Sequence, residues 1–182
     1  MEITMRKGLL MTFVWLISAT TWGTNVMSAE NLVPKKEWVY FADTVMGGVS
    51  QGQGGYDQSL NALRLNGTVS TDNNGGFIQI RADLSDTLAS EAKGIKLTVK
   101  GNGETYYIHL RNRSARLPWQ YYSASFKAPK TWTTIQIPYG AFERSSSFMS
   151  KTYDPKSTKS LGIVAFGKNY KADLFVKEIS TY

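Results

Sequence analysis

The chain has 182 residues, no cysteine, one histidine and a formal net charge of +7. This length fits one domain, and about 150 residues bury roughly 68–70% of their extended surface, enough for a hydrophobic core. Without cysteine there are no disulfides, thiolate zinc sites or cysteine nucleophiles, and a single histidine excludes multi-histidine metal sites. Lys and Arg are spread along the chain, so we expect no nucleic-acid partner.

Residues 1–29 have the pattern of a secretory signal peptide. Two basic residues precede an apolar run over residues 9–19, and Ala29 offers a small residue to the signal peptidase, with Gly23 as the alternative cleavage position. The run is shorter than the about 20 residues of a membrane span. We therefore expect a periplasmic or secreted protein, with an uncleaved membrane anchor as the alternative, and residues 30–182 as its single domain.

The rest of the chain consists of short β-type runs separated by turn residues. Apolar and polar residues alternate within these runs, and no long helical period is present, which predicts an all-β antiparallel sandwich. The turn over residues 100–103 predicts a hairpin between its two flanking strands. The expected strands span residues 76–82, 94–100, 105–111, 119–126, 132–137, 161–167 and 172–180. Their expected core residues are Ile78, Ile80, Ile95, Leu97, Val99, Ile108, Leu110, Ile135, Ile137, Ile163 and Val176.

Two polar segments end in paired glycines just before apolar alternation resumes. Residues 43–50 read Asp-Thr-Val-Met-Gly-Gly-Val-Ser, and residues 73–77 read Asn-Asn-Gly-Gly-Phe. Paired glycines suit backbone that adopts positive φ or passes close to a neighbour. The turn residues of these two segments are Asp43, Gly47, Gly48, Asn73, Asn74, Gly75 and Gly76.

Taken in order, these segments resemble the complex I intermediate-associated protein 30 family. The resemblance also rests on Trp38, on Trp119 to Tyr122 and on Leu161-Gly162-Ile163, and it runs from about Trp38 to Tyr182. It implies a galactose-binding-like jelly roll, two antiparallel sheets face to face. It also implies a role like that of the mitochondrial members, which assist assembly of the NADH:ubiquinone oxidoreductase.

Two chemical readings of the glycine-rich segments have simpler explanations. Residues 48–52 match the G-x-S-x-G pattern around Ser50, but the glycines that follow cannot readily begin the helix that a hydrolase nucleophile elbow needs. We therefore expect Ser50 to lie in a glycine-rich turn, its hydroxyl capping its own backbone. Asp43, Asp72, Asn73 and Asn74 are calcium-ligand types, but turn chemistry explains them without a metal, so we expect no cofactor, with a structural calcium as the alternative.

Alternation places polar and aromatic side chains together on the sheet face opposite the aliphatic core. His109 is either part of a ligand face or a hydrogen-bonded structural residue. Aromatic rings stack on sugars or anchor proteins, and Arg, Gln and His orient ligands by hydrogen bonds. The expected binding face comprises Arg81, Tyr107, His109, Arg111, Trp119 and Tyr121, with Gln79 beside them.

These residues predict binding rather than catalysis, because one histidine and no cysteine do not assemble a nucleophile, base and orienting group. The first hypothesis is an accessory or assembly factor that binds a protein partner or a membrane-associated complex. The alternative is a carbohydrate-binding module of the cell envelope. Copurification with a membrane complex or retention on polysaccharide separates the two.

Overall fold

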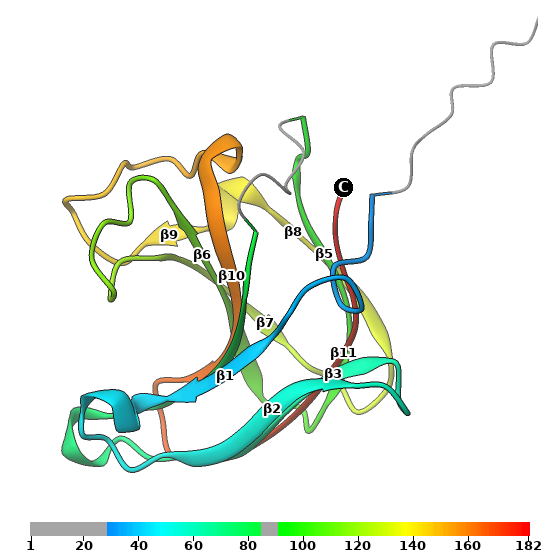
Figure 1. Cartoon of the computed structure of the whole chain (residues 1–182), viewed down its shortest axis with the longest axis vertical. Helices are drawn as coiled ribbons and strands as arrows, with labels where there is room; N and C mark the ends of the chain where they lie inside the picture. The colour runs from blue at the N-terminus through cyan, green and yellow to red at the C-terminus, as the bar shows by residue number, and fades with distance from the viewer. Residues whose placement is uncertain (1–28, 85–90) are drawn as a thin grey trace, which may run out of the picture.

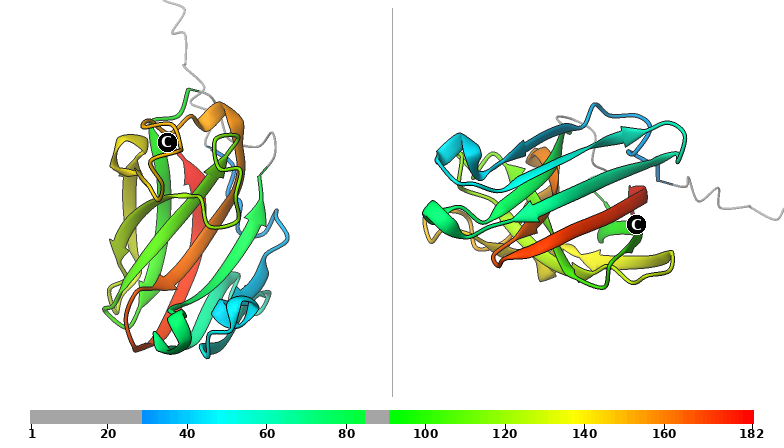
Figure 2. Two further views of the ribbon diagram at one scale, coloured as in Figure 1. Left: turned by 90° about the vertical axis from the view of Figure 1, so that its left-hand side faces the viewer. Right: turned by 90° about the horizontal axis from the view of Figure 1, so that it is seen from below.

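The computed structural model describes residues 29–84 and 91–182, which form two antiparallel β-sheets packed face to face (Figures 1 and 2). All of the expected signal peptide except its last residue, Ala29, lies outside the described residues. Within the described part of the chain, no helix is long and apolar enough to cross a membrane.

The larger sheet has six strands in the order β1-β4-β10-β6-β7-β9, and the smaller has five in the order β2-β3-β11-β5-β8. All neighbouring strands are antiparallel. The six strands are β1 (Val39–Ala42), β4 (Phe77–Asp83), β6 (Thr105–Asn112), β7 (Tyr122–Lys127), β9 (Glu143–Arg144) and β10 (Thr158–Phe166). The five are β2 (Gln51–Asp57), β3 (Ala62–Val69), β5 (Gly94–Gly101), β8 (Thr133–Pro138) and β11 (Tyr170–Thr181).

Short 3-10 helices join several of these strands. They are η1 (Asp43–Met46), η2 (Asp72–Asn74), η3 (Tyr139–Ala141) and η4 (Pro155–Ser157). The predicted all-β jelly-roll sandwich is thus confirmed. The segment between Phe142 and Ser160 holds β9, η4 and the start of β10.

The core fills the space between the sheets with the aliphatic side chains that alternation places inward. Every predicted core residue is buried except Ile135, which is partly buried against the core. Aromatic residues extend the core, since the rings of Tyr106 and Tyr122 are fully buried. The inward register of the predicted strands is therefore confirmed.

The predicted hairpin between β5 and β6 is wrong. β5 pairs with β8 and β11, whereas β6 pairs with β7 and β10, so the chain crosses from one sheet to the other at residues 102–104. The turn bonds to the β7–β8 connection, with the Gly101 and Gly103 amides donating to the carbonyls of Pro129 and Ala128. Alternation gives the same inward pattern in either sheet, so it cannot tell a hairpin from a crossing between sheets.

The glycine-rich segment after Ser50 forms strand β2 rather than a turn. Gly52 and Gly54 leave no room for a Cβ, which would meet the backbone of β3 at the first position and the side chain of Ile80 at the second. These glycines let β2 lie close to its neighbours. No helix follows Ser50, so the strand–turn–helix context of a hydrolase elbow is absent from this described segment.

Candidate functional site

A groove lies on the outer face of the six-stranded sheet, the face opposite the core. Its floor is a row of paired residues across three strands, in which Gly162 of β10 lies between Arg81 of β4 and His109 of β6. In Figure 1 the helix η1 and the β6–β7 connection stand on opposite sides of this face. The groove encloses about 280 Å³, near the lower limit of small-ligand pockets.

The groove has apolar walls and a polar floor. Val45 and Met46 of η1 form one wall and are 70% and 65% exposed, while Pro118 and Trp119 form the other. The remaining aromatic lining residues are Phe41, Phe77, Tyr121 and Phe166, and the polar ones include Gln79, Arg81, His109, Arg111 and Ser160. No Asp or Glu is among the described lining residues.

Arg81 projects from β4 into this groove. Its guanidinium lies over the ring of Phe41, 4.7 Å from the ring centroid, in a cation–π contact. Within residues 29–84 and 91–182, no carboxylate forms an ion pair with Arg81. The positive charge of Arg81 therefore lies against an aromatic ring, with no counter-ion among the described residues.

His109 is a buried, neutral residue of the floor. Its ring stacks on Tyr121 with centroids 3.8 Å apart and an interplanar angle of 10°. Burial lowers the pKa of His109 to about 3, because the charged form loses its hydration. Its Nε2 atom has no hydrogen-bond partner in the described part of the chain, so the hydrogen-bonded structural reading does not account for this nitrogen.

Arg111 shapes the groove by holding the β6–β7 connection. Its Nε donates to the carbonyl of Gln120 at 3.1 Å, and one terminal nitrogen donates to Leu117 at 2.9 Å and to Ala115 at 3.4 Å. Burial, and to a lesser extent the nearby charge of Arg81, lowers the pKa of Arg111. Arg111 is thus a positioning residue for the wall that carries Trp119.

Two predicted face residues take different positions from those expected. Trp119 precedes β7, which begins at Tyr122, so the predicted strand over 119–126 starts three residues too early. The indole is 63% exposed at the groove wall. Tyr107 lies on the predicted face but packs edge-on against Phe166 at 5.9 Å and is not a lining residue. The other four predicted residues, like Trp119, line the groove; they are Arg81, His109, Arg111 and Tyr121.

Asp43 is the centre of the first glycine motif and is fully buried. Its Oδ1 accepts from the amide of Ser50 at 3.0 Å, and its Oδ2 accepts from the Ser50 hydroxyl at 2.5 Å and from the amides of Gly76 at 2.6 Å and Phe77 at 3.2 Å. Burial raises the pKa of Asp43, but these hydrogen bonds outweigh it and hold the pKa below its usual value. The Asp43 clamp joins η1 to the start of β4.

The paired glycines make room for this clamp. A Cβ at Gly48 or at Gly75 would overlap the Asp43 carboxylate, while Gly47 and Gly76 have φ of +89° and +132°. Ser50 is 1% exposed and its hydroxyl donates to Asp43 rather than capping its own backbone. That geometry makes Ser50 part of the scaffold.

Residues considered as calcium ligands also take part in the protein's own turns and hydrogen bonds. The Asp43 oxygens are occupied by protein donors, and Asn73 and Asn74 adopt left-handed φ of 55° and 58° in η2, a conformation that Asn tolerates. Among the described residues, no three His, Cys, Asp or Glu side chains are grouped for a metal.

Sequence reasoning missed several groove residues. Gly162 at the floor was noted only as part of the family resemblance, although an isolated glycine in a β-pattern signals close approach. A Cβ there would lie 2.9 Å from Oε1 of Gln79. Val45 and Met46 were also missed, since their positions depend on the turn at η1 and not on alternation within a strand. Phe41 was missed because no strand was predicted over β1.

The chain belongs to the complex I intermediate-associated protein 30 family, whose sequence pattern matches residues 27–175. No curated protein sequence matches significantly. Among solved structures, the chain is similar to the family 11 carbohydrate-binding module of the cellulosomal cellulase Lic26A-Cel5E of Clostridium thermocellum, at 18% identity and a TM-score of 0.64 over 85% of this chain and 94% of that one.

Two further solved structures share the architecture. A family 11 module from Clostridium thermocellum in complex with a β-1,3-1,4-mixed-linked tetrasaccharide matches at 19% identity and a TM-score of 0.62, over 79% of this chain and 87% of that one. A family 30 module of a Clostridium thermocellum cellulosomal cellulase matches at 14% identity and a TM-score of 0.51, over 75% and 83%. These likenesses establish the galactose-binding-like sandwich fold.

Proposed function

We propose that this chain is a non-catalytic accessory or assembly factor that binds a protein partner, part of a membrane-associated complex, in the groove of the six-stranded sheet. Membership of the complex I intermediate-associated protein 30 family supports the assembly role. The signal-like segment over residues 1–29 favours a partner in the cell envelope.

The observation that carries the proposal is the composition of the groove walls. Exposed Met46 and Trp119 both line the groove, together with the polar residues of its floor. Trp and Arg are enriched among binding hot spots, and Met is frequent at adaptable protein-binding surfaces. Exposed apolar side chains beside orienting polar groups suit a partner segment that inserts into the groove.

A carbohydrate ligand is the second candidate, supported by the similarity to family 11 carbohydrate-binding modules. Sugar platforms need free aromatic faces. Here Arg81 covers one face of Phe41 and His109 covers one face of Tyr121, which leaves Trp119 as the most exposed ring of the groove. The side-chain arrangement therefore favours a protein ligand.

The test compares the unaltered chain with a groove-filling variant. Gly162→Val projects a side chain from the floor, where the nearest atom is the flexible end of Gln79, and valine suits a strand. The matched control is Ser125→Val, at an exposed position of β7 outside the groove lining. All three proteins are used as bait to copurify partners from detergent-solubilised envelope. Their migration is also compared in native gels with and without mixed-linked β-glucan.

The proposal expects a membrane complex to copurify with the unaltered chain and with Ser125→Val, and recovery to fall about ten-fold or more with Gly162→Val, as expected for loss of a hot spot. Copurification that Gly162→Val leaves unchanged would refute the groove as the binding site. If the glucan gel retards the unaltered chain and Ser125→Val but not Gly162→Val, the result would support the carbohydrate alternative.

A further inference from the structure

The groove combines positive charge with an apolar lining, and its described lining residues include no carboxylate. Arg81 and Arg111 both line it, whereas no Asp or Glu of the described chain does. Two acidic residues of this sheet are Asp83, at the end of β4, and Glu143, which pairs with Ser123 at the β9 edge. Both lie outside the lining.

The donors of this charged floor have room for an incoming acceptor. Among the described residues, the guanidinium of Arg81 makes a cation–π contact with Phe41 and no ion pair, so the N–H groups at the rim of its plane can bind an incoming acceptor. Beside it in the same row, Gly162 contributes no side chain, and the buried Nε2 of His109 has no hydrogen-bond partner within residues 29–84 and 91–182. A carboxylate above Gly162 would find a fork-shaped cation on one side, and planar guanidinium pairs with carboxylate by two parallel hydrogen bonds.

The apolar walls define what must accompany that carboxylate. Met46 and Trp119 are more than half exposed, and burying them requires apolar atoms from the ligand. A neutral sugar supplies hydroxyl donors, whose strongest partners are carboxylates, and the described lining offers none. An extended peptide supplies both acidic and apolar side chains within a few residues.

We infer that the groove recognises an acidic segment of a protein, with a Glu or Asp carboxylate bound at Arg81 and neighbouring aliphatic or aromatic side chains placed between Met46 and Trp119. This inference rests on the proposed function, because it names the chemistry of the partner that the same groove binds.

Peptide selection tests the inference and requires no purified partner. A random twelve-residue peptide library displayed on phage is selected on the full chain, after depletion on Gly162→Val to remove peptides that bind elsewhere. The selected peptides are then synthesised, and their affinities are measured by fluorescence anisotropy. Counterparts with every Glu replaced by Gln and every Asp by Asn separate the effect of charge from that of shape.

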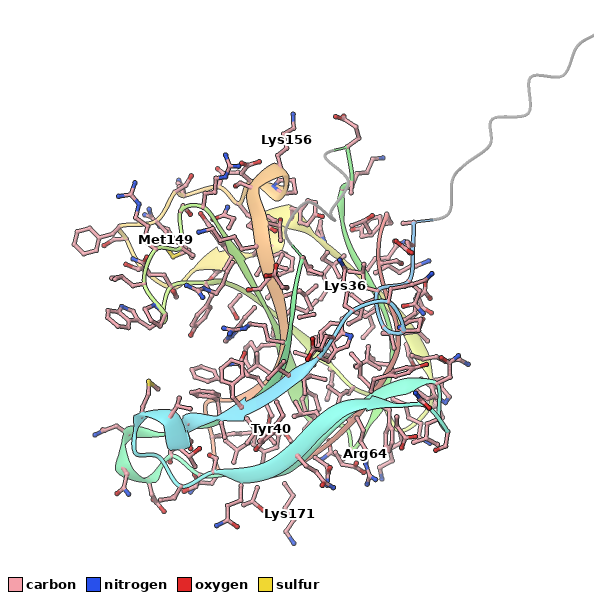
Figure 3. The ribbon with its side chains drawn as sticks, in the orientation of Figure 1. Lys36, Tyr40, Arg64, Met149, Lys156 and Lys171 are labelled. Atoms are coloured by element: carbon pink, nitrogen blue, oxygen red, sulfur yellow. The ribbon has the colours of Figure 1, made fainter. Side chains whose placement is uncertain are left out.

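The chain supplies a matched pair of arginine variants. Arg64 of β3 also lies over a phenylalanine ring, 5.3 Å from the centroid of Phe175, but Figure 3 shows it on the opposite side of the molecule from the groove. Arg81→Gln should weaken binding of the acidic peptides about ten-fold, about 1.4 kcal/mol, whereas Arg81→Lys should recover part of the loss. Arg64→Gln should leave affinity within about two-fold, as a remote surface change does.

Each outcome decides the inference. Selected peptides rich in Glu or Asp beside Leu, Phe or Trp, weakened by amide replacement and by Arg81→Gln, support it. Groove-dependent peptides that are neutral or basic overturn the acidic preference but leave the protein-binding function intact. A third outcome is that no groove-dependent peptide is selected, while polygalacturonate gels retard the unaltered chain but not Gly162→Val. That outcome overturns the inference in favour of an acidic polysaccharide.

Discussion

Replacing Asp43 by Asn should destabilise the fold far more than the loss of one surface charge. The carboxylate accepts four hydrogen bonds while fully buried. An Asn side chain has one acceptor oxygen, so whichever way it is turned, its NH2 group faces an N–H or O–H donor. If the oxygen replaces Oδ2, the amide of Ser50 loses its partner.

The magnitude follows from these contacts. One buried amide left without an acceptor costs about 1–3 kcal/mol. The three remaining bonds change from charge-assisted to neutral, each losing about 1 kcal/mol, since charge-assisted bonds are roughly twice as strong. The expected loss is about 4–6 kcal/mol, against the about 5–15 kcal/mol of a whole domain.

Urea unfolding followed by tryptophan fluorescence measures this loss. Asp57→Asn is the control, because Asp57 accepts comparable bonds from Ser59 and Leu60 in a solvent-accessible turn, where water can replace them. Its effect should be much smaller. If Asp43→Asn changed the free energy of unfolding by less than about 1 kcal/mol, the clamp would not stabilise the fold and the argument from its hydrogen bonds would be wrong.

Three other measurements check the fold and the groove. Leu97→Ala should lower the free energy of unfolding by about 2–5 kcal/mol, since Leu97 is fully buried; a change below about 0.5 kcal/mol would contradict that burial. The pKa of His109 is about 3 in the folded state and near 6.5 in the unfolded state. As pH falls below 6.5, the unfolded state therefore binds a proton at His109 before the folded state does. The folded state should lose about 4–5 kcal/mol of stability between pH 6.5 and pH 3. His109→Phe keeps a ring on Tyr121 and should remove that part of the urea-measured pH dependence; an unchanged profile would show that His109 is not its source. Trp119→Ala should weaken partner binding by about 1–4 kcal/mol with little effect on thermal unfolding. Arg111→Ala should weaken binding too and should also lower the free energy of unfolding by about 1–2 kcal/mol. Equal thermal stability of the two variants would contradict the positioning role of Arg111.

Alternation predicted side-chain direction well and sheet membership poorly. The inward direction of Ile108 and the outward direction of His109 follow from the period of two, which holds in any strand. Whether β5 pairs with β6 depends on contacts at residues 101–103 with the β7–β8 connection, which lie nearly 30 residues away in sequence. Period-two reasoning carries no information about such a contact.

The groove was predictable where strands build it and not where turns do. Arg81 and His109 were found because their strand neighbours are aliphatic. Met46 was missed because it reaches the groove through η1, whose position depends on the buried Asp43 carboxylate. The sequence shows an Asp beside paired glycines, but the same letters also fit a calcium loop, and only the hydrogen-bond partners separate the two readings.

The Asp43 clamp and the groove floor differ in how tightly packing constrains their residues. Asp43, Gly48 and Gly75 form a clamp in which each side chain, or its absence, is required by close packing, so the clamp holds the wall at η1 in place. Gly162 and Arg81 lie on the open floor, where other side chains fit without disturbing the core. Packing therefore constrains the clamp and one wall of the groove, whereas the floor can carry other side chains and so other ligand chemistry. For that reason the partner of this chain has to be sought through the groove floor and its charge rather than through the clamp.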